Sequence, residues 1–336
     1  MRIKLINPDK GRNKQAFYPF IQYQKMFEIF DIEFTTYGQS DFTFIGVDDF
    51  VNRKIPLTDS INQGIEFVNK YKFEKVFLFD STDSTSLLGI YEVLNGTNAL
   101  HLFKNQLLNF DSYKEPTYFN KWFFDVGDED IKVGYDISHK NRNKIQLSGW
   151  NLGFYNQSYH TFIDRDTDES NLICDVCALY QYEHAENYDH GHRNDMAYTN
   201  HRYRPYEILH STDIKVAMGK VDQNKYYDIL MKSKFALSPF GMGEICYRDF
   251  ELMRMGVPMI KPYMDDVLTE PNIYVPWVTY IPVNHDWSNL AEIIDTVLNT
   301  DYSKYLEIAD NLRTRFRRNY LVSELISKWK KLLELK

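Results

Sequence analysis

The sequence has few cysteines and no long apolar run. Its 336 residues include only three cysteines, Cys174, Cys177 and Cys246, which are too few for the disulfide framework typical of small secreted domains. Cys174 and Cys177 form a lone C-x-x-C in a predicted strand, where residues three apart point to opposite faces, so no metal or redox site is expected there. No segment approaches the ~18 consecutive apolar residues of a membrane span, and residues 1–14 lack a signal-peptide core. The sequence therefore predicts a cytoplasmic protein without a transmembrane segment.

The sequence also has fewer basic than acidic residues. Lys and Arg number 39 against 47 Asp and Glu, which gives a net charge of −8 at pH 7. Nucleic-acid partners normally require a basic face, so a nucleic-acid partner is not expected. Basic residues gather only near the C-terminal end, as Arg313, Arg315, Arg317, Arg318, Lys328, Lys330 and Lys331. We expect this cluster to be the solvated face of two helices, and peripheral contact with a membrane surface or an anionic polymer is the alternative.

Recognisable metal-ligand motifs are missing as well. Histidines and acidic residues do gather in one stretch, as His184, Asp189, His190, His192, Asp195 and His201. Their spacing is loose, with no H-E-x-x-H and no cysteine partner, so a solvated loop is the better interpretation. We therefore predict no metal site and no cofactor.

The length and the order of the predicted elements indicate two α/β lobes. Single cores stop growing at ~250–300 residues, and the chain exceeds that length. Strands are predicted at 3–6, 32–36, 42–45, 75–79, 171–178, 214–218, 235–237 and 257–260, and helices at 15–30, 59–71, 204–210, 226–233, 244–255, 289–298, 302–317 and 321–335. Alternating strands and helices favour a parallel sheet in each half. Residues 98–108 and 144–153 fit no clear pattern.

The boundary between the lobes is placed in a polar stretch without a core pattern, residues 157–168. We predict an N-terminal lobe at 1–160, a C-terminal lobe at 168–318 and a last helix at 319–336. High aromatic content, 16%, supplies core volume and stacking surfaces for sugar rings.

The most informative segment is 233–261, SKFALSPFGMGEICYRDFELMRMGVPMIK, which predicts strand, glycine loop, helix and strand in succession. Gly241 and Gly243 lie in a loop where the backbone can approach a bound group closely. Glu244 is expected to open the helix, and at about 100° per residue it shares one helix face with Arg248 and Glu251.

That helix face suits a nucleotide sugar. A diphosphate would lie over the glycine loop and the helix N-terminus, with Arg248 adding a charge-assisted contact, and Glu251 would accept hydrogen bonds from the ribose. The alternative is a surface helix whose Glu244–Arg248 pair is an ordinary ion pair of about 0.3–0.5 kcal/mol. The position of the loop at the carboxyl end of a strand favours the ligand site.

The same segment resembles the donor-binding segment of GT-B glycosyltransferases, most closely the exostosin-type enzymes and related bacterial and viral transferases. The resemblance implies an α/β fold with two Rossmann-like lobes facing a central cleft and a C-terminal helix that crosses back to the first lobe. It implies that the lobe at 1–160 binds the acceptor, that the lobe at 168–318 binds the donor and that 319–336 is a closing helix. It gives donor-binding roles to Gly241, Gly243, Arg248 and Glu251, and Tyr247, which precedes Arg248, is a further donor-binding candidate. Glu244 matches the first acid of the E-x7-E pattern of many retaining members, with six rather than seven residues before Glu251.

Further candidates lie at predicted strand ends. Asp80 and Asp83 follow a first-lobe strand, where either carboxylate would serve as a base, although helix capping by Asp83 is an equal explanation. Asp80 and Glu244 are expected on opposite walls of one large pocket. Lys220 follows another strand and Arg193 lies in the first long loop of the second lobe, so both are candidate phosphate ligands.

His101 and Lys104 lie at a comparable depth in the first lobe. They are candidate contacts for acceptor or phosphate, although two exposed polar residues on a helix are the commoner outcome for such a pair.

These observations predict a metal-independent hexosyl- or pentosyltransferase that moves a sugar from a nucleotide-sugar donor to a hydroxyl of a glycan or small-molecule acceptor. Asp80, Asp83 and Glu244 are the catalytic candidates. The alternatives are a phage or viral DNA-modifying glycosyltransferase and a non-catalytic sugar-nucleotide binding protein of the same fold. Acidic runs in the first half, such as DVGDEDIK, argue against a duplex acceptor.

Overall fold

The computed structural model describes residues 1–52, 54–114, 136–181 and 195–334. Within them, the first half forms a parallel sheet of six strands in the order β2-β1-β3-β4-β5-β7. The strands are β1 (Arg2–Ile6), β2 (Glu33–Thr35), β3 (Phe42–Gly46), β4 (Val76–Asp80), β5 (His101–Lys104) and β7 (Ile145–Leu147). Every residue of β3 and β4 is buried, as expected for central strands covered on both faces.

The helices of the first lobe pack around this sheet. They are α1 (Asn13–Gln22), α2 (Gln24–Glu28), α3 (Val47–Phe50), α4 (Leu57–Asn69), α5 (Ile90–Asn95), α6 (His139–Arg142) and α7 (Leu152–Tyr155). The single helix predicted at 15–30 is wrong, because α1 ends at Gln22 and α2 begins at Gln24. Tyr23 between them is not helical, with a ψ of +21°.

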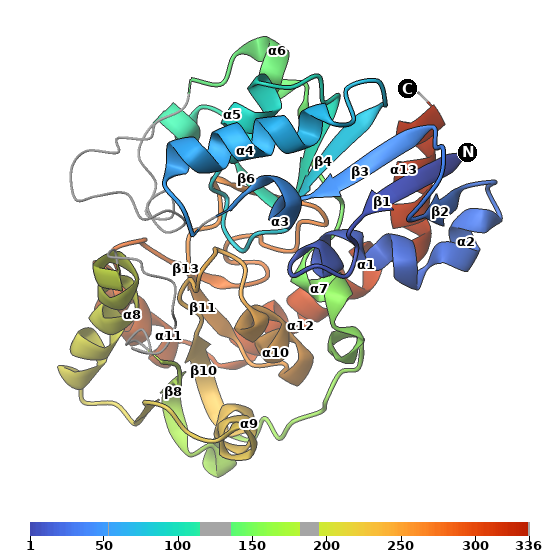
Figure 1. Cartoon of the computed structure of the whole chain (residues 1–336). Helices are drawn as coiled ribbons and strands as arrows, with labels where there is room; N and C mark the ends of the chain where they lie inside the picture. The colour runs from blue at the N-terminus through green and yellow to red at the C-terminus, as the bar shows by residue number, and fades with distance from the viewer. Residues whose placement is uncertain (53, 115–135, 182–194, 335–336) are drawn as a thin grey trace.

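The second half forms a parallel sheet of five strands in the order β13-β11-β10-β8-β9 among the described residues. Its strands are β8 (Cys174–Ala178), β9 (Val216–Met218), β10 (Ser233–Leu237), β11 (Met259–Pro262) and β13 (Ile281–Val283). The helices are α8 (Asp195–His210), α9 (Gln223–Met231), α10 (Tyr247–Met255), α11 (Leu290–Leu298) and α12 (Ser303–Asn319). Figure 1 shows this lobe below the first one.

Two connections join the lobes. β6 (Gln106–Leu108) from the first half pairs antiparallel with β12 (Val267–Thr269) from the second, in a ribbon outside both large sheets. The last helix, α13 (Val322–Glu334), returns to the first sheet (Figure 1), where Trp329 donates to the Ser148 carbonyl at 3.0 Å. The predicted crossing of the C-terminal helix to the first lobe is therefore confirmed.

Much of the basic C-terminal cluster is used inside the chain. Arg313 donates to the carbonyl oxygens of Ile163 and Met253, and Arg315 donates to that of Asn272. Lys328 donates to the Leu147 carbonyl at 3.0 Å and pairs with Glu270. These side chains hold the last helices against the rest of the protein, so they are not simply a solvated face. No helix in the described part of the chain combines the length and apolar character needed to cross a bilayer.

Trp329 is the central packing residue of the closing helix. It is fully buried, and its ring centroid lies within 5.9 Å of five aromatic rings, those of Phe20, Phe44, Phe79, Phe103 and Trp150. We predict that Trp329→Ala lowers the free energy of unfolding by about 3–5 kcal/mol, because it opens a cavity in this cluster. Urea unfolding measures the loss. Trp277→Ala is the control: that ring is 45% exposed, and a loss as large as that of Trp329→Ala would contradict the account.

Candidate functional site

The glycine loop between β10 and α10 is held by a buried ion pair. Asp249 and Lys261 are both fully buried, and their charged atoms lie 3.1 Å apart. Asp249 also accepts hydrogen bonds from the Ser238 hydroxyl, the Tyr274 hydroxyl and the Cys246 amide. Lys261 donates in addition to the Glu244 carbonyl at 2.7 Å. Each buried charge is thus compensated, and the loop is fixed at both ends.

The start of α10 differs from the sequence prediction. The helix begins at Tyr247 rather than at Glu244, because the Asp249 carboxylate accepts from the Cys246 amide and caps the helix there. Gly256 ends the helix in the left-handed conformation, with φ of +67°, which glycine adopts readily. Glu244 therefore lies in the loop and does not share a helix face with Arg248.

Glu244 makes a further contact between the lobes. Its carboxylate accepts from the Thr85 backbone amide at 3.1 Å and from the Thr85 hydroxyl at 2.7 Å. It also accepts from the side-chain amide of Gln106 at 3.1 Å. The side chain is buried, and burial raises the pKa of the Glu244 carboxyl above its ordinary value of 4.5. These contacts give Glu244 a structural role between the lobes, and the catalytic role predicted for it stays a prediction.

The two loop glycines serve different neighbours. A Cβ atom on Gly243 would lie 1.4 Å from the Asp83 carbonyl oxygen, so glycine is required here by the approach of the first lobe rather than by a ligand. A Cβ atom on Gly241 would lie 3.2 Å from the Cys246 sulfur and 3.7 Å from a guanidinium nitrogen of Arg202. Gly241 is therefore the glycine that lies beside a cation.

Two arginines flank one tyrosine at the carboxyl end of β8. The guanidinium carbons of Arg202 and Arg248 each lie 5.0 Å from the ring centroid of Tyr180. Arg248 donates weakly to the Leu179 carbonyl at 3.4 Å, while its Nε is buried without a hydrogen-bond partner. Among the described residues no carboxylate lies within 4.0 Å of Arg248, so the ordinary Glu244–Arg248 ion pair is not formed there. The Tyr180 hydroxyl is also buried and unpartnered. Unsatisfied donors beside two cations suit an anionic ligand.

Glu251 lies one helical turn beyond Arg248 and faces two tyrosines of α9. The Tyr226 hydroxyl donates to one oxygen of its carboxylate at 2.8 Å, and the Tyr227 hydroxyl lies 3.5 Å from the other oxygen. A carboxylate accepts several hydrogen bonds, so this arrangement orients Glu251 and leaves it capacity for hydroxyl donors.

The remaining cations predicted for the donor are less well placed. Lys220 is exposed and follows Gly219, whose amide donates to Tyr206 at 3.2 Å. The Tyr206 hydroxyl in turn donates to the Tyr180 carbonyl at 2.8 Å, which links the backbone before Lys220 to the end of β8. Arg193 lies outside the described residues, as do His184, Asp189, His190 and His192. No group of three metal-ligating side chains occurs among the residues that are described.

His201 belongs to the interior. Its Nε2 accepts from the Phe240 amide at 3.2 Å, and burial, followed by the positive charge of Arg202, lowers the pKa of His201 to about 3. The imidazole is therefore neutral at physiological pH, and it supports the loop after β10.

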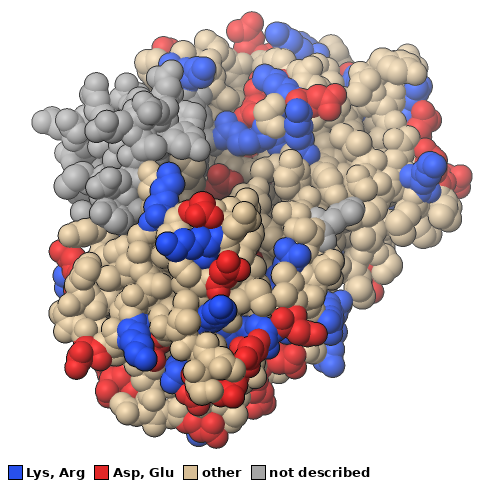
Figure 2. Space-filling view, turned by 90° about the horizontal axis from the view of Figure 1, so that it is seen from below, with Lys and Arg blue, Asp and Glu red and all other residues tan. Residues whose placement is uncertain are grey.

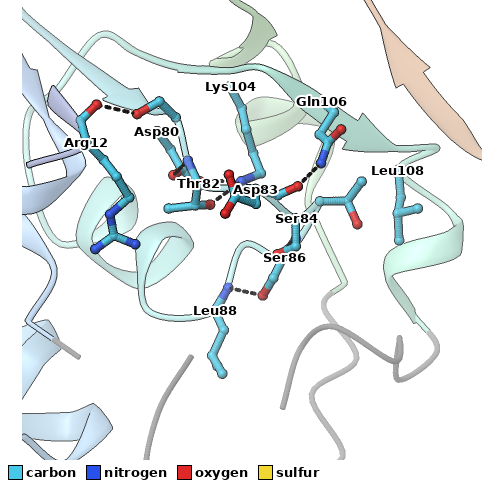
Figure 3. Close-up of polar contacts among 12 residues, drawn as sticks. Arg12, Asp80, Thr82, Asp83, Ser84, Ser86, Leu88, Lys104, Gln106 and Leu108 are labelled. Carbon is cyan, nitrogen blue, oxygen red and sulfur yellow. Dashed lines mark hydrogen bonds and ion pairs between the residues drawn. The ribbon is translucent and has the colours of Figure 1, made fainter. Parts of the chain in front are cut away.

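The first-lobe loop after β4 is shown in Figure 3. Asp80 pairs with Lys104, and both are fully buried; Asp80 also accepts from the Thr82 amide at 2.9 Å. His101 and Lys104 thus lie in the buried strand β5, and the exposed helix considered for them is wrong. Asp80 and Glu244 are both buried, and their placement on opposite walls of one large pocket stays a prediction.

Asp83 is the exposed member of this loop. Burial and, next, the negative charge of Asp83 raise the pKa of Tyr247, the first residue of α10. Asp83 and Tyr247 therefore approach each other from different lobes. Tyr247 also lines a groove of about 610 Å³ whose other wall is formed by first-lobe residues, among them Asp9, Lys14, Tyr18 and Tyr155.

Asp249, Lys261 and Tyr180 belong to this cluster of contacts, and the sequence analysis did not select them. A lysine inside the apolar run VPMIKP was the available signal for Lys261, because a buried lysine needs a carboxylate partner. The capping role of Asp249 was hidden because cysteine, rather than serine or threonine, precedes the helix.

The architecture is similar to that of solved glycosyltransferase structures. The Anabaena protein HepE, solved in complex with UDP and glucose, is 11% identical with a TM-score of 0.50, and the match covers 99% of each chain. The sucrose-phosphate synthase of Thermosynechococcus elongatus is 12% identical over 100% of this chain and 98% of its own, with a TM-score of 0.48. A glycosyltransferase from Rickettsia africae ESF-5 is 13% identical over 98% and 97%, with a TM-score of 0.42.

At such identity the likeness to HepE concerns the fold, and it confirms the predicted α/β fold of two lobes, the GT-B arrangement. No protein-family model matches the sequence, and no curated protein sequence matches it. The narrower resemblance to exostosin-type enzymes stays a prediction.

We predict that Glu244→Gln preserves the fold, because the amide oxygen can accept from Thr85 and Gln106 while the amide nitrogen donates to the Thr85 hydroxyl. Glu244→Ala leaves those donors without an acceptor and should lower the free energy of unfolding by about 1–3 kcal/mol. The raised pKa means that the folded state holds the proton more tightly than the unfolded state, so wild type loses stability as pH rises from 4.5 through the folded-state pKa.

Glu244→Gln removes that loss, and urea unfolding at a series of pH values above 4.5 measures it. An unchanged pH dependence in Glu244→Gln would contradict the burial of an ionisable carboxyl at the lobe contact.

Proposed function

We propose that the protein is a glycosyltransferase that moves a sugar from a nucleotide-sugar donor to a hydroxyl of an acceptor. The observation that carries the proposal is the pair Arg202 and Arg248 around Tyr180, with Glu251 one turn beyond Arg248. This cluster lies at the carboxyl ends of parallel strands, where open α/β sheets place their ligands.

The donor diphosphate is assigned to Arg248. Its buried, unpartnered Nε and its lack of a described carboxylate partner leave it available for phosphate oxygens. The N-terminus of α10 adds little, since Asp249 already caps it. Gly241 adjoins Arg202, a buried cation that also donates to the Gln181 and Phe240 carbonyls. Lys220 is a secondary candidate for the same phosphates. Stabilisation of the departing diphosphate is the main catalytic demand of such a transfer, and these cations are proposed to meet it without a metal ion.

The ribose is assigned to Glu251, which Tyr226 orients. A uridine donor carrying a hexose is the first to test, because HepE was solved with UDP and glucose. Under this proposal residues 168–318 bind the donor, residues 1–160 bind the acceptor and residues 319–336 close the structure.

Asp83 is the proposed base that accepts the proton of the acceptor hydroxyl. It is the exposed carboxylate of the loop after β4, opposite Tyr247. Asp80 is a positioning residue, because its ion pair with Lys104 fixes the strand end from which this loop departs (Figure 3). The face shown in Figure 2 carries Lys, Arg, Asp and Glu side by side, which does not favour a duplex acceptor.

A thermal-shift screen against UDP-, GDP-, CMP- and dTDP-sugars tests the donor assignment, since a ligand of the native state raises the melting temperature. Release of the nucleoside diphosphate then distinguishes an enzyme from a sugar-nucleotide binding protein, and repetition with EDTA tests metal independence. If none of these nucleotides raises the melting temperature, the proposal fails.

We predict that Arg248→Ala weakens binding of the nucleoside diphosphate by about 2–5 kcal/mol, because it removes a partly buried cation from the phosphates. Isothermal titration calorimetry measures the loss. Arg254→Ala is the matched control on the same helix, where the side chain donates to the Thr161 carbonyl away from the arginine pair. Equal affinity of Arg248→Ala and wild type would remove Arg248 from the donor site.

Glu251→Gln separates the ribose from the phosphates. We predict a loss of about 1.5–3 kcal/mol that appears equally with the nucleoside diphosphate and with the intact sugar donor, because the ribose is common to both. Glu307→Gln on the exposed face of α12 is the control. A loss restricted to the intact donor would move Glu251 from the ribose to the transferred sugar.

A further inference from the structure

The groove between α1, α7 and the start of α10 has the size and the chemistry of a ligand site. Its volume of about 610 Å³ lies within the range of small-molecule pockets. Tyr18 and Tyr155 line it from the first lobe, and Tyr247 lines it from the second. None of these residues belongs to the arginine pair, so the groove is separate from the proposed phosphate contacts.

The tyrosines offer ring faces. Tyr18 and Tyr155 meet edge to face, with centroids 5.3 Å apart and ring planes at 62°. Tyr155 is 38% exposed and Tyr247 is 43% exposed, so both combine an anchored ring with accessible surface. Aromatic rings present an apolar face together with a polar hydroxyl, a combination that suits the CH faces and hydroxyl rims of sugar rings.

The polar lining is mixed in charge. Asp9 and Lys14 supply one charge of each sign, and the Gln22 amide supplies both a donor and an acceptor. An apolar ligand would leave these groups without partners, and a polyanion would meet Asp9 as well as Lys14. A neutral, hydroxyl-rich ligand fits all of them.

The groove also ends where a transfer reaction needs its acceptor. Tyr247 lines the groove and is followed in the chain by Arg248, the proposed phosphate ligand. Asp83, the proposed base, lies against the same loop, because its carbonyl oxygen would be 1.4 Å from a Cβ atom on Gly243, four residues before Tyr247. We propose that this groove binds a saccharide acceptor, with a sugar ring packed against Tyr155 and its reacting hydroxyl directed toward Asp83. This assignment rests on the proposed glycosyltransferase function and names its acceptor class.

Saturation-transfer NMR tests the proposal, with UDP present and with methyl glycosides of glucose, galactose, mannose and N-acetylglucosamine as probes. We expect wild type to transfer saturation to at least one glycoside. Tyr155→Ala should weaken the binding of that glycoside about tenfold, because the stacking ring is lost. Tyr155→Phe keeps the ring and should remain close to wild type. Tyr37→Ala, which alters a 73% exposed tyrosine outside the groove, should have no effect.

A UDP titration of each variant separates this inference from the proposed function. UDP affinity should be equal in wild type and Tyr155→Ala, since Tyr155 lies outside the donor site. If wild type does not bind any of the screened nucleotides, the proposed function itself fails. If nucleotide binding is intact, the acceptor assignment is overturned either by wild type giving no saturation transfer to any glycoside or by Tyr155→Ala transferring as well as wild type.

Discussion

The ion pair between Asp249 and Lys261 is the interaction on which the glycine loop between β10 and α10 depends. Both charges are fully buried, and three further hydrogen bonds converge on the carboxylate from Ser238, Cys246 and Tyr274. Burying two charges is costly unless each is fully satisfied, so neither partner is readily lost alone. The pair fixes the end of β10, the start of α10 and the path of the loop between them, which together decide where Arg248 points.

The same loop also joins the two lobes. Lys261 holds the Glu244 carbonyl, while the Glu244 carboxylate receives donors from Thr85 and Gln106 of the first lobe. Gly243 packs on the Asp83 carbonyl. The pairing of β6 with β12 adds a second link between the two halves of the chain. The position of the exposed Asp83 relative to Tyr247 and Arg248 is therefore set by buried contacts rather than by side chains in open solvent. A change in the loop would alter both the proposed phosphate site around Arg248 and the first-lobe wall that carries Asp83.

The sequence predicted most of the fold because its signals there are strong. Continuous apolar runs in β3 and β4 and the left-handed Gly256 leave little choice of structure, and the element order implies parallel sheets. Arg248 and Glu251 were selected as site candidates because of their spacing on a helix after a glycine loop.

The errors concern buried polar residues. Lys104 looks like a surface residue in the sequence, yet it pairs with Asp80 in the core, and the partner comes from the neighbouring strand. Glu244 was assigned to the helix because no local pattern reveals that Thr85, far earlier in the chain, donates a hydrogen bond to its carboxylate. Such pairings depend on tertiary contacts, which periodicity and local motifs do not encode.

A crystal structure of the protein with UDP would test the central claim most directly. The account predicts that the diphosphate lies against Arg248 beside Tyr180, with the ribose hydroxyls within hydrogen-bond distance of Glu251. A nucleotide bound elsewhere, with the Arg248 guanidinium free of phosphate contacts, would contradict it.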